Sequence, residues 1–565
     1  MIMKSASTKT VSLLHIAALT LALLLLAWAS ISSLTFLVGD TGLRFIQVRE
    51  LIAQRWQTFA IDYPAQVLDP DFQHTPFYYA YSIIEGDIYL NISHFFTFVA
   101  SFLYAGLGIW GLAAAPALGG VLTAVAVYRL GVLTHVAYPR LLLWTAVFGT
   151  PILFYSLELW DHTWATACAA WAVYGLARGL MNGRWQPIFW GGVAAGIGLG
   201  QRPEMYVFAI ALGGALVIVA WRQSQRWLAL IGGGLAGALP VWFLQYRWVG
   251  HPFGLAFAPH FFGYGRPAVF PVQSYDGLTI TPAVKIGRLL FYIQARDLGT
   301  FAAAMLIVLG LFILIFSLRV PAWRRPGWIW GSLILTVIGY GLFTCQAQNV
   351  ILSGLFTTFP LIIFALAFVE KPNDLTTTRP VYLLAWLTAV IFIILMLGLW
   401  PAYGGKQWGA RYLLPAYPLL LFAAFYSLTR RVKVEKRSYA QTLRAYFAVL
   451  LGVSLIMQIL GARLIFNSHA YQLPVRDSVQ ALPADIILVN DPFFPPAMAA
   501  TDKQFLYVGS AKDLQTLIPR LAESGVQRFG FITAEGSRLA PPEHIGNIKI
   551  TQTSAIIYEI GSDSP

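Results

Sequence analysis

Long apolar runs separated by short polar segments dominate the first 466 residues of the chain. The runs are about 18 to 22 residues long, which is the length that a helix needs to cross the hydrocarbon core of a bilayer. Counting the runs and alternating their direction predicts about thirteen crossings. We therefore expect a polytopic α-helical membrane protein, with its transmembrane domain over residues 1–466.

Two longer polar segments, 40–94 and 247–298, interrupt the apolar runs and are predicted to be outer loops. Within the first loop, apolar and polar residues of 45–56 fall on opposite faces of a helix, which predicts a helix that lies on the membrane surface. The next apolar run, 95–107, is too short for a comfortable crossing. It predicts a re-entrant or surface-lying helix.

The remainder of the chain, 467–565, loses the membrane pattern. Short apolar stretches at 485–490, 528–532 and 555–560 are typical of strands, and 511–524 has the spacing of an amphipathic helix. This pattern predicts a small soluble α/β domain, and the parity of the crossings places that domain on the extracytoplasmic side. No duplicated halves are apparent that would favour the inverted repeats of a transporter.

Charge is scarce and unevenly placed. Only 11% of the 565 residues are charged and 58% are hydrophobic, while the formal net charge is +13. The basic residues gather in short connections between apolar runs, which is the positive-inside pattern of membrane proteins. We therefore expect anionic membrane lipids, and not nucleic acid, beside this charge. The strongest cluster contains Arg430, Arg431, Lys433, Lys436 and Arg437.

Ionisable residues at the predicted outer ends of crossings are unusual in a chain that otherwise avoids charge. Such residues are costly near a bilayer, so they indicate function more often than structure. They are Asp40, Asp161, His162, Arg202, Glu204, Lys406 and Arg411.

Structural roles are the alternative for several of these residues. Asp40 is well placed to be the N-cap of the surface helix. Arg202 and Glu204 have the spacing of an ion pair that stabilises a helix break. An anchor at the membrane interface is the alternative for Lys406 and Arg411.

Three segments carry a resemblance to a known family. They are Gly39-Asp40, then Asp161-His162 with the Gly-rich run 191–200 leading to Arg202-Pro203-Glu204, and finally Trp408-Gly409-Ala410-Arg411-Tyr412-Leu413-Leu414-Pro415. Together they resemble the GT-C superfamily of integral membrane glycosyltransferases, which includes protein O-mannosyltransferases and the aminoarabinose transferases of lipid A. The third segment looks like the W-G-x-R-Y-L-L-P entry into a late helix of many bacterial members. The resemblance covers residues 1–430 in order and topology.

The resemblance implies a GT-C-like fold and a transferase in a bacterial plasma (inner) membrane. The implied donor is a polyprenyl-phosphate-linked sugar, and the implied acceptor lies on the extracytoplasmic face. Transfer with inversion suits one carboxylate base and no covalent intermediate. On this basis we expect Asp40 to be the base or acceptor-orienting carboxylate and Asp161 to assist it.

The implied substrate-binding residues are polar and mostly basic. Arginine suits a departing lipid phosphate because its planar fork matches the phosphate oxygens. In the second outer loop, Arg247, Arg266 and Lys285 also compete for this role. The expected set is Arg44, His162, Arg202, Glu204, Arg288, Arg296, Lys406 and Arg411.

A divalent metal ion stays open as a cofactor. Metal-ligand spacings occur in the first outer loop, yet solvated loop charge is the favoured interpretation, because this side is remote from cytosolic nucleotide sugars. Both cysteines, Cys168 and Cys345, lie inside apolar runs, which argues against a disulfide framework and a cysteine metal site. The spacings are Asp69-Pro70-Asp71 with His74, and Glu85 with Asp87.

Two other functions compete with glycosyl transfer. A transporter or flippase of lipid-linked saccharides predicts charges at the bilayer midplane and repeated halves, whereas the ionisable candidates gather at helix ends. A non-catalytic envelope assembly protein predicts that the soluble tail carries the function and that Asp40 and Asp161 tolerate alanine.

Overall fold

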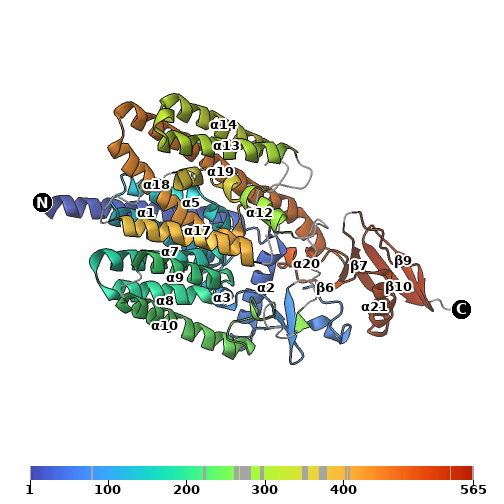
Figure 1. Ribbon diagram of the computed structural model, residues 1–565. Helices are drawn as coiled ribbons and strands as arrows, with labels where there is room; N and C mark the ends of the chain where they lie inside the picture. The colour runs from blue at the N-terminus through green and yellow to red at the C-terminus, as the bar shows by residue number, and fades with distance from the viewer. Residues whose placement is uncertain are drawn as a thin grey trace. The chain divides into compact units, whose positions relative to one another are not determined.

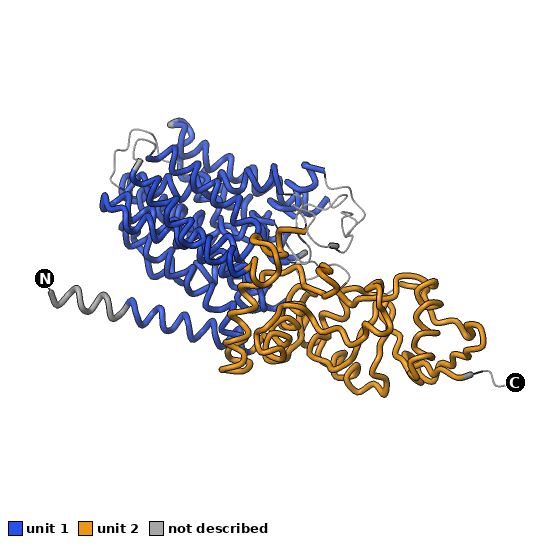
Figure 2. The backbone as a smooth tube through the Cα atoms, turned by 90° about the horizontal axis from the view of Figure 1, so that it is seen from below, with its two compact units in different colours: residues 1–28, 113–244, 272–465 blue, residues 29–112, 245–271, 466–565 orange. Residues whose placement is uncertain are grey.

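A computed structural model describes residues 2–77, 80–220, 224–259, 266–267, 281–292, 298–346, 354–367, 378–400, 404, 407–534 and 536–562. Figure 1 shows that helices make up most of the chain and that strands gather toward its C-terminus. The chain forms two compact units, coloured separately in Figure 2. The first unit consists of residues 1–28, 113–244 and 272–465, and the second of residues 29–112, 245–271 and 466–565.

The first unit is a bundle of helices, as the apolar runs predict. Neighbouring helices pack in pairs, among them α7 with α8, α9 with α17, and α13 with α14. The helices that lie wholly or mostly in it are α1 (Ile2–Ile31), α4 (Ile109–Leu133), α5 (Pro139–Phe148), α6 (Ile152–Ser156), α7 (His162–Asn182), α8 (Trp185–Leu199), α9 (Glu204–Ala220), α10 (Ser224–Val249), α12 (Pro282–Phe291), α13 (Leu298–Arg319), α14 (Pro326–Gln346), α15 (Leu355–Thr358), α16 (Ile362–Ala367), α17 (Arg379–Leu399), α18 (Ala416–Val434) and α19 (Arg437–Gln480).

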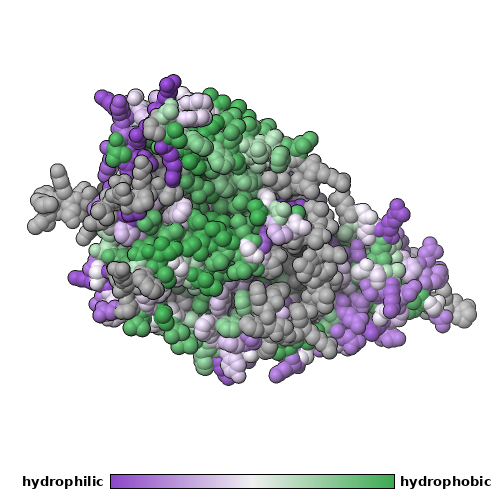
Figure 3. Space-filling model, viewed as in Figure 1, coloured by the Kyte–Doolittle hydropathy of each residue, from purple (hydrophilic) through white to green (hydrophobic). Residues whose placement is uncertain are grey.

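Seven helices of the described residues are long and apolar enough to cross a membrane. The outward faces of two of them, α13 and α14, expose large apolar side chains, which form part of the green surface in Figure 3. The protein is therefore a multi-pass membrane protein, and the predicted fold class is confirmed. The count of about thirteen crossings stays a prediction. The seven are α1, α4, α10, α13, α14, α17 and α19.

Two predicted crossings are interrupted helices. The run 141–157 contains α5 and α6, separated by Gly149-Thr150-Pro151, and the run 350–369 contains α15 and α16, separated by Pro360. Proline lacks the backbone N–H that would continue the helical hydrogen bonds, which accounts for the breaks. A continuous apolar run therefore predicts the length of chain in the bundle but not the continuity of the helix.

The Gly-rich run 191–200 lets α8 pack closely against two neighbours. A Cβ atom on Gly191 would lie 2.8 Å from the Ala172 carbonyl oxygen of α7. On another face of α8, a Cβ atom on Gly196 would lie 2.2 Å from the Gly234 carbonyl oxygen of α10. Small residues allow membrane helices to approach in this way, so these glycines serve packing.

The second unit joins the first outer loop to the C-terminal part of the chain. A single hydrophobic core contains Leu43 and Leu90 from the loop together with Leu488, Leu506 and Phe529 from the C-terminal part. These two stretches therefore fold together, although hundreds of residues separate them in the sequence. The predicted division at residue 466 into a membrane domain and a soluble domain stays a prediction.

The first outer loop and the short apolar run after it form two helices and three strands of a small sheet, and the second outer loop adds the fourth strand. The predicted surface helix is α2 (Gly39–Ala53), and the short apolar run is α3 (His94–Leu107). The sheet order is β1-β3-β2-β4, with all its pairs antiparallel. Its strands are β1 (Ala60–Ile61), β2 (Tyr81–Ile84), β3 (Asp87–Leu90) and β4 (Arg266–Pro267), and the helical turn η1 (Pro64–Val67) follows β1.

The C-terminal part forms a sheet in the order β6-β5-β7-β10-β9-β8. The pairs β5–β6 and β5–β7 are parallel and the others antiparallel. All three predicted strands and the predicted helix are present, while β6, β8 and β9 were not predicted. The elements are β5 (Ile486–Val489), α20 (Phe494–Ala497), β6 (Gln504–Tyr507), α21 (Ala511–Glu523), β7 (Arg528–Ile532), β8 (His544–Ile545), β9 (Ile548–Gln552) and β10 (Ile557–Ser562).

Candidate active site

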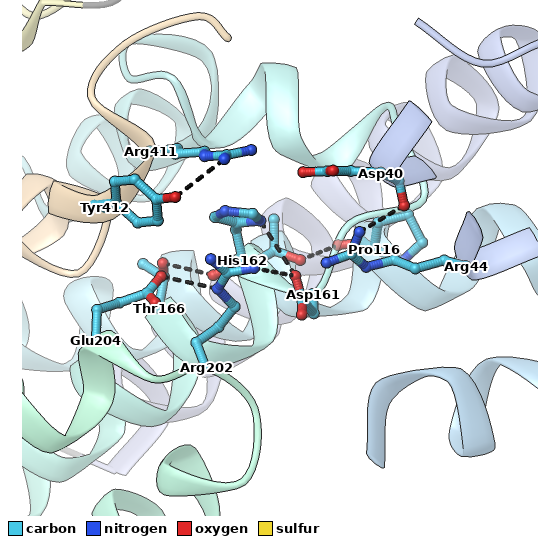
Figure 4. Close-up of polar contacts among 11 residues, drawn as sticks. Asp40, Arg44, Pro116, Asp161, His162, Thr166, Arg202, Glu204, Arg411 and Tyr412 are labelled. Atoms are coloured by element: carbon cyan, nitrogen blue, oxygen red, sulfur yellow. Dashed lines mark hydrogen bonds and ion pairs between the residues drawn. The ribbon is translucent and has the colours of Figure 1, made fainter. Parts of the chain in front are cut away.

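Arg202 holds two carboxylates in the first unit (Figure 4). Its Nη1 atom lies 3.2 Å from Asp161 Oδ1, and its Nε atom lies 2.9 Å from Glu204 Oε1. Asp161 precedes α7 and Glu204 opens α9, so the arginine joins the beginnings of two helices. Both carboxylate side chains are 1% exposed. An arginine fork that binds two buried carboxylates fixes all three groups in one geometry.

His162 adjoins the same network. Its Nδ1 atom lies 3.3 Å from Asp161 Oδ1, and the imidazole is buried. The next residue fixes the start of α7 in place, because the Thr163 hydroxyl donates to the Pro116 carbonyl of α4 over 2.9 Å. Pro116 lies inside α4 and interrupts its hydrogen-bond ladder. The beginning of α7 is therefore anchored to a neighbouring helix.

The segment 408–415 brings Arg411 to this network. Gly409 has a φ of +72°, and a Cβ atom there would lie 2.6 Å from Pro151 Cγ, so glycine alone suits the position. The Ala410 N–H donates to the Tyr417 hydroxyl over 3.0 Å. Arg411 then opens the helical turn η3 (Arg411–Leu413), which precedes α18.

The Arg411 guanidinium lies over the Tyr412 ring, 4.9 Å from its centroid, and donates to the Tyr412 hydroxyl over 3.1 Å. It is close enough to His162 and Arg202 to interact with both electrostatically. The structure thus brings together four of the predicted residues within the bundle, and Arg411 adds a second guanidinium. Two arginines beside two carboxylates and an imidazole can bind a phosphate and sugar hydroxyls.

Asp40 and Arg44 belong to the second unit, on α2. The N-cap residue of α2 is Val38, and Asp40 lies in the first turn, so the alternative of Asp40 as N-cap is wrong. The Thr41 hydroxyl donates to the Val38 carbonyl over 2.7 Å. Arg44 is buried and donates from Nη1 to the Asp40 carbonyl over 2.6 Å (Figure 4). A carboxylate in the first turn is stabilised by the helix dipole.

The remaining basic candidates lie in different structural environments. Arg288 and Lys285 are buried on α12, and Lys285 donates to the Trp400 carbonyl over 2.8 Å. Arg247 is exposed near the end of α10. The backbone of Arg266 pairs with β2. Arg296 and Lys406 lie outside the described residues.

Asp69, the first residue of the predicted metal-ligand spacing, has a structural role. Its carboxylate accepts from the Tyr63 hydroxyl over 3.0 Å and from the Gln73 and His74 backbone N–H groups over 2.8 Å each. It is fully buried, so the interpretation as solvated loop charge is wrong for this residue. The described part of the chain contains no group of three or more His, Cys, Asp or Glu side chains placed to hold a metal ion.

A cavity of about 320 Å³ lies along α2 in the second unit. Ile46, Arg49 and Glu50 of α2 line one wall, and residues 495–505 line another. Arg49 donates to the Ala499 carbonyl over 3.1 Å. Burial, opposed in part by a hydrogen bond from the Asp62 backbone, raises the pKa of the Glu50 carboxyl. The sequence gives no hint of this cavity, because distant segments build it.

Two buried polar residues near Arg202 escape the sequence analysis. Tyr155 lies inside an apolar run, and Gln201 ends a Gly-rich one, so neither interrupts a pattern. Both are buried, and their side-chain polar atoms make no hydrogen bond with the rest of the described chain. Buried polar groups normally have partners, so their placement near the network marks them as candidates.

Comparison with solved structures shows that the chain has the GT-C fold, which is the fold that the three sequence segments predict. The structure of ArnT from Cupriavidus metallidurans in the apo state has 14% identity to this chain, covers 98% of each chain and gives a TM-score of 0.51. ArnT bound to undecaprenyl phosphate gives 13% identity, 96% and 97% coverage and a TM-score of 0.48. The Archaeoglobus fulgidus oligosaccharyltransferase gives 13% identity, 90% and 67% coverage and a TM-score of 0.44.

At this level of identity the likeness to ArnT establishes the fold. No protein-family model matches the sequence, and no curated protein matches it.

Proposed function

We propose that this protein is a membrane glycosyltransferase that moves a sugar from a polyprenyl-phosphate donor to an extracytoplasmic acceptor. The observation that carries the proposal is the buried network of Arg202, Asp161 and Glu204, with Arg411 within electrostatic range. Carboxylates inside a membrane bundle can accept hydrogen bonds from sugar hydroxyls, and arginine can bind a phosphate. The GT-C fold supports the same class of reaction.

The positions of the charges in the first unit support an extracytoplasmic site. The network lies where α7 and α9 begin, while Arg178 lies near the other end of α7. Similarly, Arg411 precedes α18, whose last turn contains Arg431 and Lys433. By the positive-inside rule the basic ends face the cytoplasm, so the network faces the other side of a bacterial plasma membrane.

In the proposed reaction, the acceptor hydroxyl oxygen forms a bond to the anomeric carbon while the bond from that carbon to the phosphate oxygen breaks. Asp40 takes up the hydroxyl proton or orients the hydroxyl, and polyprenyl phosphate leaves with the bonding electrons. One carboxylate and no covalent intermediate give inversion at the anomeric carbon. Arg411, with Arg44 and Arg288, stabilises the charge of the departing phosphate. Asp161 and His162 orient the acceptor.

Replacing Asp40 tests the proposal. Asp40→Asn keeps the size and the helix position of the side chain but removes the proton acceptor, so transfer to an extracytoplasmic acceptor should be lost while undecaprenyl phosphate binding stays near the wild-type value. Transfer of a radiolabelled sugar in membranes measures the activity. Titration of the detergent-solubilised protein with undecaprenyl phosphate measures the binding.

Asp71→Asn, at an exposed carboxylate of the same outer loop, is the matched control and should retain activity. Full activity of Asp40→Asn would remove the proposed mechanism. Movement of an intact lipid-linked saccharide across vesicles, without any glycosylated product, would favour a flippase instead. Tolerance of alanine at both Asp40 and Asp161 would favour an assembly protein.

A further inference from the structure

Tyr155, in the short helix α6, has a buried hydroxyl whose hydrogen-bonding capacity is unused. The residue is fully buried, and its hydroxyl makes no hydrogen bond with any of the described residues. A buried phenol without a hydrogen-bond partner in the protein destabilises the folded state relative to one that is paired. Such a group is retained at a cost to stability, which points to a partner that arrives with a ligand.

The Tyr155 ring cannot turn away to find another partner. It stacks on the His162 ring, with centroids 5.0 Å apart, and packs in a tilted arrangement against the Trp160 ring, with centroids 4.9 Å apart. The Phe154 ring packs against its edge at 5.3 Å. The start of α6 is fixed as well, because Pro151 packs against Gly409 of the segment that presents Arg411. The direction of the hydroxyl is therefore set by packing on several sides.

Two guanidinium groups lie within electrostatic range of the hydroxyl. Tyr155 interacts electrostatically with the guanidinium groups of Arg411 and Arg202 and with the hydroxyls of Tyr412 and Tyr417. Arg202 already binds two carboxylates, and Arg411 lies over the Tyr412 ring. An O–H donor within electrostatic range of two guanidinium groups complements an anionic oxygen better than a neutral one.

We propose that the Tyr155 hydroxyl donates a hydrogen bond to a non-bridging oxygen of the donor's phosphate and is a donor-binding residue. The inference rests on the proposed function, because it takes that phosphate to belong to a polyprenyl-phosphate donor. The hydroxyl adds a short, directional contact to the charge of Arg411. It fixes the orientation of the phosphate and thereby of the bond that breaks.

Tyr155→Phe removes the hydroxyl and keeps the stacked ring. We expect two effects of opposite sign. The melting temperature of the ligand-free protein should rise or stay the same, because an unsatisfied buried group has gone. The affinity for undecaprenyl phosphate should fall about ten- to a hundredfold, the range expected for a hydrogen bond to a charged group. Binding of undecaprenol, which lacks the phosphate, should not change.

Tyr340→Phe is the matched control. Its hydroxyl is also buried, but it donates to the Phe356 carbonyl over 2.5 Å. Loss of that bond leaves a carbonyl without its partner, so the melting temperature should fall while undecaprenyl phosphate binding stays unchanged. The two variants thus separate a structural hydroxyl from one reserved for a ligand.

Unchanged undecaprenyl phosphate affinity of Tyr155→Phe overturns the inference, and so does a lowered melting temperature like that of Tyr340→Phe. If the wild-type protein binds undecaprenyl phosphate no better than undecaprenol, the inference and the proposed donor fail together. If binding depends on the phosphate and on Tyr155 but no sugar is transferred, the inference stands and the proposed function fails.

Discussion

Arg202 shows how one side chain can organise a site inside an apolar bundle. It is only 12% exposed, and each of its two carboxylate partners is 1% exposed. Removing a partner from such a group leaves a buried charge without compensation, whereas the intact network adds little net stability. This asymmetry makes the network rigid and at the same time sensitive to substitution.

At this residue scale, Glu204→Ala should lower the free energy of unfolding by roughly 3–5 kcal/mol, because it takes one counter-ion from the Arg202 guanidinium. The exposed Arg528–Glu559 pair, with side chains 54% and 42% exposed, provides the control. Glu559→Ala should cost less than about 1 kcal/mol, because water screens an exposed pair. Denaturant unfolding in detergent measures both. Equal effects of the two substitutions would contradict the buried network.

Most residues of this network could be singled out from the sequence because charge is rare in the chain. Asp161, His162, Arg202, Glu204 and Arg411 each interrupt an apolar pattern, and the structure brings them into one network. Residues that leave the pattern intact gave no comparable signal. A tyrosine or glutamine within an apolar stretch becomes notable only when its burial and the lack of a partner are known.

At the scale of elements, α2 packs so closely on the C-terminal part of the chain that no side chain fits at Gly42. A Cβ atom on Gly42 would lie 1.7 Å from the Pro496 carbonyl oxygen of α20. The same helix binds the Ala499 carbonyl through Arg49 and contributes Leu43 to the shared core. The helix that carries Asp40 is therefore held by the residues that follow α19.

Gly42→Ala should destabilise the protein by roughly 1–3 kcal/mol, because the contact is with backbone atoms that must move. This loss exceeds the gain of about 1 kcal/mol that alanine brings within a helix. Gly213→Ala in α9 is the control, since its Cβ atom would meet nothing within 4 Å. It should be neutral or slightly stabilising. A rise in melting temperature for both variants would show that α2 does not pack closely on α20.

At the scale of the whole molecule, α19 connects the membrane part to the C-terminal part. Its 44 residues, at the rise of an α-helix, give a length of about 66 Å, roughly twice the hydrocarbon core of a bilayer. One helix is thus long enough to cross the membrane and continue beyond it. Its first residue, Arg437, belongs to the strongest basic cluster.

The predicted topology can be tested by labelling single cysteines, with Cys168 and Cys345 replaced by alanine. Ser438→Cys, beside the basic cluster, and Ser554→Cys, in the C-terminal part, are both at exposed positions. A membrane-impermeant maleimide should label Ser554→Cys in intact spheroplasts and Ser438→Cys only after permeabilisation. Labelling of Ser438→Cys in intact spheroplasts would reverse the orientation and remove the extracytoplasmic site.

The pattern along the chain is enough to identify a multi-pass membrane protein, because hydrophobic runs of bilayer length and rare charges at their ends are local properties. The strands and the helix predicted for the C-terminal part rest on local periodicity too. The folded structure was needed to show that the first outer loop shares a core with that part, and that Asp69 is structural. It also singled out Tyr155 as a buried group without a partner among the described residues. These properties depend on contacts between residues far apart in the sequence, which periodicity does not encode.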